Sequence, residues 1–68
     1  MFVEIIINGH PCTINLQYAM EIYFNSFEGI ITITYHGPVS RKYHFETVKE
    51  AETAYYKILN RLGNGGVM

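Results

Sequence analysis

Residues 47–62 constrain the fold of this chain more than any other stretch, because they alone combine a helical apolar period with readable ends. Thr47 stands three residues before Glu50, which is the pattern of a capping box, and Gly63 predicts a left-handed C-terminal stop. The apolar stripe between these ends consists of Val48, Ala51, Tyr55, Ile58 and Leu62, widened by Ala54 and Leu59. A helix of this length is marginally stable alone, so we expect its stripe to cover a sheet made by the preceding residues.

The dipeptide Asn8-Gly9 predicts a two-residue hairpin turn, because both residues tolerate the positive φ of a type I′ turn. Such a turn fixes the register of the two strands that it joins. The predicted pairs on one face are Ile7 with His10, Ile5 with Cys12, and Val3 with Ile14. These pairs are nearly all apolar, so we assign that face to the core.

Residues 12–24 alternate without a change of phase and contain no Gly or Pro. We therefore predict one long, bent second strand; a tight turn at residues 17–19 keeps the same phase and gives five strands, but its composition suits a turn poorly. A four-residue loop at residues 26–29 pairs Phe24 with Ile31 and Met20 with Tyr35. The His36-Gly37-Pro38 turn leads into the last strand, with a loop of three or five residues.

The expected fold class is α+β: a four-stranded antiparallel β-meander with a long bent second strand and one C-terminal α-helix packed on one face. Residues 1–62 are expected to form a single ββββα domain. Residues 63–68 are expected to form a flexible tail, because the stretch is rich in glycine.

Composition argues against several functional classes. The net charge is −1, so no overall field attracts nucleic acid or an anionic membrane, and no apolar run has membrane-spanning length. The chain contains no Asp, which leaves no Ser-His-Asp triad, and the spacing of its histidines and of Cys12 matches no zinc pattern. We expect a non-enzymatic cytoplasmic protein without metal or cofactor.

One sheet face is expected to lie opposite the helix and to carry several apolar side chains. The residues predicted to bind a protein or a small ligand are Phe2, Ile6, Tyr23 and Ile30 on this face, together with Tyr56 on the outer side of the helix. Burial of such a face against a second copy or a protein partner is typical of small interaction modules. The first hypothesis is therefore a small accessory or regulatory module, expected to be a homodimer.

Single-stranded nucleic-acid binding is the alternative hypothesis. Its candidate residues are His36, Arg41, Lys42 and His44, which are interleaved with the rings of Tyr35 and Tyr43. Cations beside aromatic rings on a sheet suit phosphates and stacked bases. Nucleic acid is not favoured, because the chain has only five basic residues and the two tyrosines fall on the predicted core face.

The predicted order of four strands and a helix is similar to that of small dimeric single-strand-binding transcriptional coactivators. This resemblance is one of topology alone. The basic loops of that family have no match in residues 8–11 or 25–29 of this chain, so the resemblance carries no site residue over.

Overall fold

The computed structural model describes residues 1–37 and 39–66, with side chains described through residue 63. The chain is α+β, with five antiparallel strands followed by one helix. In order, the elements are β1 (Phe2–Ile7), β2 (His10–Asn15), β3 (Ala19–Asn25), β4 (Ile30–Tyr35), β5 (Val39–His44) and α1 (Val48–Gly66).

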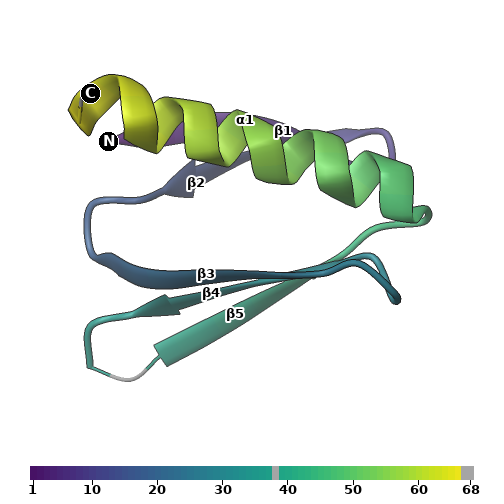
Figure 1. The fold of residues 1–68 in the computed structure, drawn as a ribbon, viewed down its shortest axis with the longest axis horizontal. Helices are drawn as coiled ribbons and strands as arrows, with labels where there is room; N and C mark the ends of the chain where they lie inside the picture. Colours follow the sequence, from purple (N-terminus) through teal and green to yellow (C-terminus); the bar gives the residue numbers. More distant parts are fainter. Residues whose placement is uncertain (38, 67–68) are drawn as a thin grey trace.

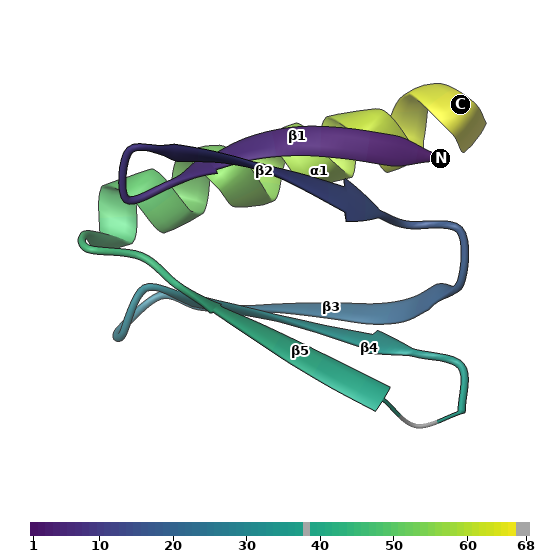
Figure 2. The same ribbon diagram turned by 180° about the vertical axis from the view of Figure 1, so that it is seen from behind.

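The strands form two sheets, β1-β2 and β3-β4-β5, and not one. Figure 1 shows the hairpin and α1 on one side of the molecule and the three-stranded sheet on the other, so that their apolar faces meet between them. Helix α1 lies between β1 and β3. The elements thus make a ring in the order α1, β1, β2, β5, β4, β3, and Figure 2 shows no helix or strand between β2 and β5.

The predicted four-stranded meander with one long second strand is wrong, because the chain turns at residues 16–18. The Asn15 side-chain oxygen accepts a hydrogen bond from the Gln17 N–H at 2.9 Å, and the Ala19 N–H donates to the Leu16 carbonyl at 3.2 Å. A straight strand from residue 12 to residue 24 would span roughly 40 Å at ~3.3 Å per residue. The longest dimension of the molecule is 29 Å, so a straight run is excluded, and the chain makes a turn between β2 and β3 where a bend was predicted. The alternative with five strands had the correct count.

The predicted register of the first hairpin is confirmed. Val3 pairs with Ile14 and Ile5 with Cys12, and the turn residues Asn8 and Gly9 have φ values of 51° and 86°. Both positive values are those that a type I′ turn requires.

The second and third hairpins confirm most of the predicted pairs. Phe24 pairs with Ile31 as predicted, but Ala19, not Met20, lies opposite Tyr35. A register shift between Ala19 and Glu21 leaves Met20 unpaired and 63% exposed, which corrects the prediction. Pairing of Tyr35 with Val39 gives the three-residue loop; Pro38 in that loop lies outside the described residues.

The predicted helix start is confirmed, whereas the predicted helix end is wrong. The Thr47 hydroxyl accepts a hydrogen bond from the Glu50 N–H at 3.1 Å, as in the first half of a capping box. Helix α1 continues through Gly63 to Gly66, so that part of the predicted flexible tail is helical; residues 67–68 lie outside the described residues. Glycine permits a left-handed stop but does not impose one, and no proline follows Gly63.

All three parts of the fold contribute to a single core. The buried side chains are Val3, Ile5, Ile14 and Leu16 from the hairpin, Ile31, Ile33 and Phe45 from the sheet and the segment after it, and Ala51, Ala54 and Ile58 from α1. The centre of the helical stripe is therefore rotated from the predicted one, and Val48 and Leu59 lie at its exposed margins.

Two polar side chains fasten the first hairpin to the rest of the molecule. The Asn8 amide donates to the His44 carbonyl at 3.3 Å, and its oxygen accepts from the Glu46 N–H at 2.8 Å. At the other end of β1, the Arg61 Nε–H donates to the Phe2 carbonyl at 2.9 Å. The β1-β2 sheet is therefore held against both the end of β5 and the C-terminal half of α1.

Candidate functional site

Three hollows mark the three places where neighbouring elements of the ring are not hydrogen-bonded strands. They lie between α1 and β1, between α1 and β3, and between β2 and β5. Each is lined by a different chemistry, so each suits a different kind of partner.

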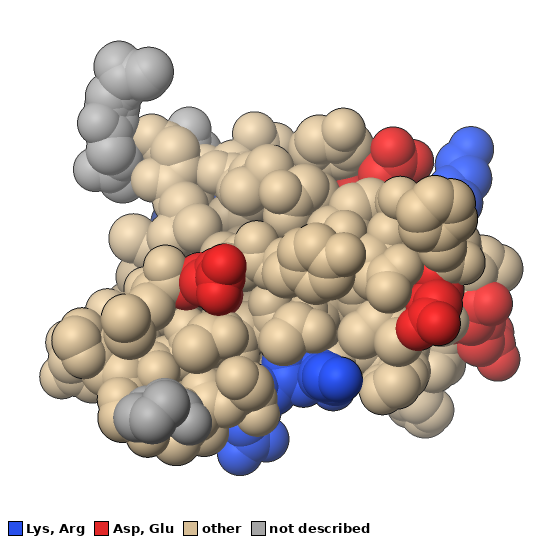
Figure 3. Space-filling view, turned by 60° about the horizontal axis from the view of Figure 1, so that its bottom comes forward, with Lys and Arg blue, Asp and Glu red and all other residues tan. Residues whose placement is uncertain are grey.

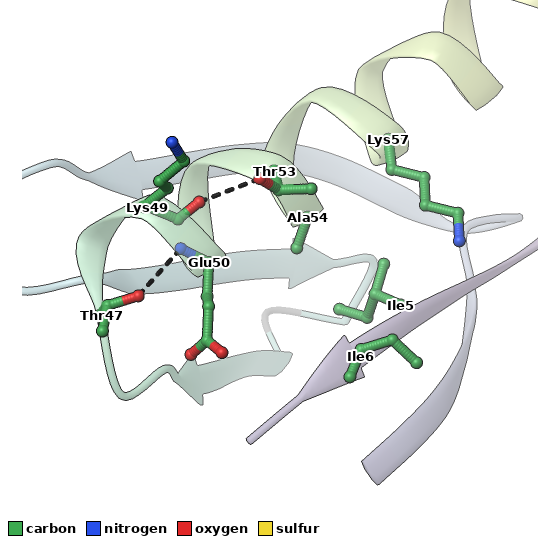
Figure 4. A pocket seen from close by; sticks show the side chains of 8 residues that line it. All are labelled: Ile5, Ile6, Thr47, Lys49, Glu50, Thr53, Ala54 and Lys57. Carbon is green, nitrogen blue, oxygen red and sulfur yellow. Dashed lines mark hydrogen bonds between the residues drawn. The ribbon is translucent and has the colours of Figure 1, made fainter. Parts of the chain in front are cut away.

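The hollow between α1 and β1 has an apolar floor and a charged rim (Figure 4). Ile5, Ile6 and Ala54 form the floor of this cavity of about 390 Å³. Lys57 extends toward β1 in Figure 4, whereas the ammonium of Lys49 points away. The polar groups here mainly serve the helix, since the Thr53 hydroxyl donates to the Lys49 carbonyl at 3.0 Å and Thr47 caps the first turn. A long lysine stem over an apolar floor is an ordinary way to cover a seam.

The hollow between α1 and β3 is lined mainly by apolar side chains, and the same two elements carry a row of aromatic rings. Its cavity of about 250 Å³ is lined by Ala19, Met20, Glu21, Ile22, Leu59 and Leu62. Beside it, Phe24 stacks on Tyr55 with ring centroids 5.1 Å apart, and the Tyr55 and Tyr56 rings lie 5.8 Å apart. We name as the α1–β3 flank the residues Met20, Ile22, Phe24, Tyr55, Tyr56, Leu59 and Leu62.

Strand β3 leaves one edge free beside the α1–β3 flank. Within the described sheet β3 pairs with β4 alone, so its other edge carries backbone N–H and C=O groups without a strand partner. Natural proteins usually blunt such edges with charges, and the only charged side chain of β3 is Glu21. A free edge next to an apolar surface is the arrangement that a further strand extends.

The groove between β2 and β5 is the most polar of the three. Its cavity of about 460 Å³ is lined by Cys12, Thr13, Ile14, Asn15, Tyr18, Tyr35, Arg41 and Tyr43. The described residues give this lining three phenols and one guanidinium and no carboxylate. Burial raises the pKa of Tyr43, and the neighbouring Tyr35 and Cys12 raise this pKa further, while Arg41 opposes them.

The residues predicted for protein or ligand binding lie on two sheets instead of one face. Phe2 and Ile6 are exposed on β1, whereas Tyr23, 60% exposed, and the half-buried Ile30 belong to the three-stranded sheet. Tyr56 is exposed on α1 and joins the α1–β3 flank. Figure 3 shows the side of the molecule on which β3–β5 lie; it is mostly uncharged, with basic side chains near the bottom of the view and another basic side chain beside an acidic one at the upper right.

The residues predicted for nucleic-acid binding do not share one face. Arg41 lies opposite Ile33 and lines the β2–β5 groove. Successive side chains of a strand point to opposite faces, so Lys42 and His44 project from the outer face of the sheet. His36 lies in the loop after β4, where its N–H donates to the Tyr18 carbonyl at 3.1 Å.

Tyr35 and Tyr43 are site residues that the sequence interpretation assigned to the core, and Tyr18 joins them in the groove. The alternation already places Arg41 in phase with Tyr43, on the inward face of its strand. A charged residue in phase with core residues is costly to bury and indicates an opening in the core at that point. That signal was present in the sequence.

Comparison of the chain with models of known families, with curated proteins and with solved structures gave no match. Over the described residues, α1 is not long and apolar enough to cross a membrane. In the same part of the chain, His, Cys and Glu side chains do not gather in a group of three.

Proposed function

We propose that this protein is a small non-enzymatic interaction module that works as a homodimer, with the α1–β3 flank as its contact surface. In this role it acts as a cytoplasmic accessory or regulatory factor that binds another protein or a small ligand. The observation that carries the proposal is the juxtaposition of an exposed apolar flank with the free edge of β3.

The balance of buried and exposed apolar side chains supports this proposal. Among the described residues, eleven large apolar side chains are exposed, against ten residues in the buried core. Single exposed apolar residues are normal on monomers, but Met20 and Leu59 line one hollow, and the Tyr56 ring continues the same flank. Burial of this surface in a dimer would remove it from water.

A second copy of the chain fits the β3 edge without a clash of charges. In an antiparallel pairing centred on Ile22, Glu21 lies opposite the partner's Tyr23 and Met20 lies opposite the partner's Phe24. The two three-stranded sheets would then form one continuous sheet, and the two α1–β3 flanks would meet across the symmetry axis. Cross-strand pairs of this kind stabilise a sheet by about 0.2–1 kcal/mol each.

Light scattering on the intact chain tests the proposal. We expect a solution mass of twice the 7.8 kDa of one chain, and a shift toward the single-chain mass in Leu59→Glu and Met20→Glu. Phe27→Ser is the matched control, because Phe27 is 92% exposed at the tip of the β3–β4 loop and outside the flank. Circular dichroism would verify that each variant is folded. A wild-type mass of one chain at about 100 μM would refute the dimer.

Single-stranded nucleic-acid binding is a second candidate, favoured by one observation: Arg41 shares the β2–β5 groove with three tyrosine rings. Lys42 and His44 project from the other face, and His36 lies in the loop after β4. A single-stranded nucleic acid in the groove would therefore meet one guanidinium, that of Arg41. Fluorescence anisotropy with a labelled oligonucleotide is the test. Salt-sensitive binding would support this candidate, and no binding at low salt would remove it.

A further inference from the structure

Within the described chain, β2 and β5 face each other across the ring without hydrogen-bonded pairing and without the helix between them (Figure 2). At the centre of the core the inward side chains are covered; Ile31, Ile33 and Ile58, for example, are fully buried. Between β2 and β5, the inward side chains of Cys12, Tyr35 and Tyr43 are only half-buried. The core thus extends into a surface groove that no segment of the described chain fills.

Both ends of this groove are fixed by hydrogen bonds. At one end the Asn8 side chain bridges to the His44 carbonyl and the Glu46 N–H. At the other end the His36 N–H donates to the Tyr18 carbonyl, which fastens the β2–β3 turn to the end of β4. The walls are therefore preformed, as in most small-molecule sites. A bounded groove suits one compact molecule better than a polymer that has to run through it.

The side chains of the groove define the chemistry of the molecule that it takes. Arg41 is the only charged group that the described residues bring to the lining, and its forked N–H donors match a carboxylate or a phosphate. Tyr18, Tyr35 and Tyr43 offer ring faces for stacking and hydroxyls for hydrogen bonds. The Tyr43 hydroxyl, whose pKa burial raises above the ordinary value of 10.0, is protonated at neutral pH like any phenol and can donate or accept a hydrogen bond.

We propose that the β2–β5 groove binds a small anion that carries an aromatic ring, with Arg41 holding the anionic group and the tyrosines holding the ring. A cavity of about 460 Å³ is large enough for one ring system with its carboxylate or phosphate. The same chemistry occurs in free aromatic acids and mononucleotides and at the end of a nucleic-acid strand. The site lies away from the α1–β3 flank, so it does not depend on the dimer.

The test is titration calorimetry on the full chain with four probes: adenosine monophosphate, 4-hydroxybenzoate, adenosine and inorganic phosphate. We expect the first two to bind and the last two, which lack either the charge or the ring, to bind at least tenfold more weakly. Arg41→Gln should weaken binding of the first two by about 10- to 100-fold, as expected for loss of a charged hydrogen-bond donor. Lys42→Gln is the matched control, because it removes the same charge one residue away on the opposite face, and it should leave the affinity unchanged.

Several results would overturn the proposal. They are no binding of any probe at millimolar concentration, equal losses in Arg41→Gln and Lys42→Gln, and binding of an eight-nucleotide strand without binding of the monophosphate. The last result would instead support the nucleic-acid candidate. Leu59→Glu separates this proposal from the dimer, since a monomeric variant should bind the probes with wild-type affinity.

Discussion

Replacement of Asn8 tests whether its side chain joins the two sheets or merely forms a turn. The side chain makes two hydrogen bonds across the molecule, to the His44 carbonyl and from the Glu46 N–H. Asn8 also has a φ of 51°, in the left-handed region. Asn8→Gly removes the hydrogen bonds but tolerates this backbone conformation. Asn8→Ala removes the hydrogen bonds and also places a residue with a Cβ in the left-handed region.

The expected losses follow from these two contributions. A net hydrogen bond contributes about 0.5–1.5 kcal/mol, and both bonds of Asn8 are exposed, so we expect Asn8→Gly to lower the free energy of unfolding by about 1–2 kcal/mol. A left-handed alanine costs about 1–2 kcal/mol more. We therefore expect Asn8→Ala to lose about 2–4 kcal/mol in total.

Urea unfolding followed by circular dichroism measures these losses, with all variants at one protein concentration because a dimer links stability to concentration. Amide hydrogen exchange adds a local readout, since the Glu46 N–H loses its acceptor in Asn8→Gly and should exchange faster. The reasoning fails if Asn8→Gly unfolds within about 0.3 kcal/mol of wild type, a difference typical of an ordinary surface position, and Glu46 remains protected. Asn8 would then act as a turn residue only.

Two further predictions concern single substitutions, one at Tyr43 and one at Gly63. The pKa of Tyr43 is raised above 10.0 in the folded chain, so this phenol ionises first in the unfolded chain, and the free energy of unfolding should fall as pH rises through and above 10. Tyr43→Phe should show a smaller fall between melts at pH 8 and pH 11. Equal falls in wild type and Tyr43→Phe would refute this assignment. Gly63→Ala should raise the free energy of unfolding by about 0.5–1 kcal/mol in urea melts, because Gly63 is helical with free space around it. A lower free energy of unfolding in Gly63→Ala would mean that the helix stops at this residue. Gly29→Ala is the matched control and should lose about 1–2 kcal/mol, since Gly29 has a φ of 70° and a Cβ there would lie 3.4 Å from the Thr47 carbonyl oxygen.

The features that sequence reasoning predicted correctly depend on residues close together in the chain. The Asn8-Gly9 turn fixes its own hairpin register, and Thr47 caps a helix whose first turn lies three residues away. The break after Asn15 was underestimated, although the Asn15 side chain stabilises that turn as Asn25 does in the next hairpin, where its oxygen accepts from the Phe27 N–H at 2.9 Å. The pairing of Met20 depends on a register shift in β3 that the alternation does not contain, and α1 passes Gly63 because glycine permits a left-handed stop without imposing one.

For the candidate sites too, the sequence determined relations between neighbouring residues, and the tertiary structure determined relations between distant ones. Alternation along the strands determined from sequence alone that Arg41 and Tyr43 share a face and that Lys42 does not, because side chains on a strand repeat with a period of two. Only the tertiary structure decided that the predicted single sheet divides into two, so that Phe2 and Tyr23 lie on different sheets. It also decided that α1 covers the space between β1 and β3 and leaves the space between β2 and β5 open. The reason is that one helix fills one gap in a core enclosed by five strands, and which gap it fills depends on contacts between residues far apart in the sequence.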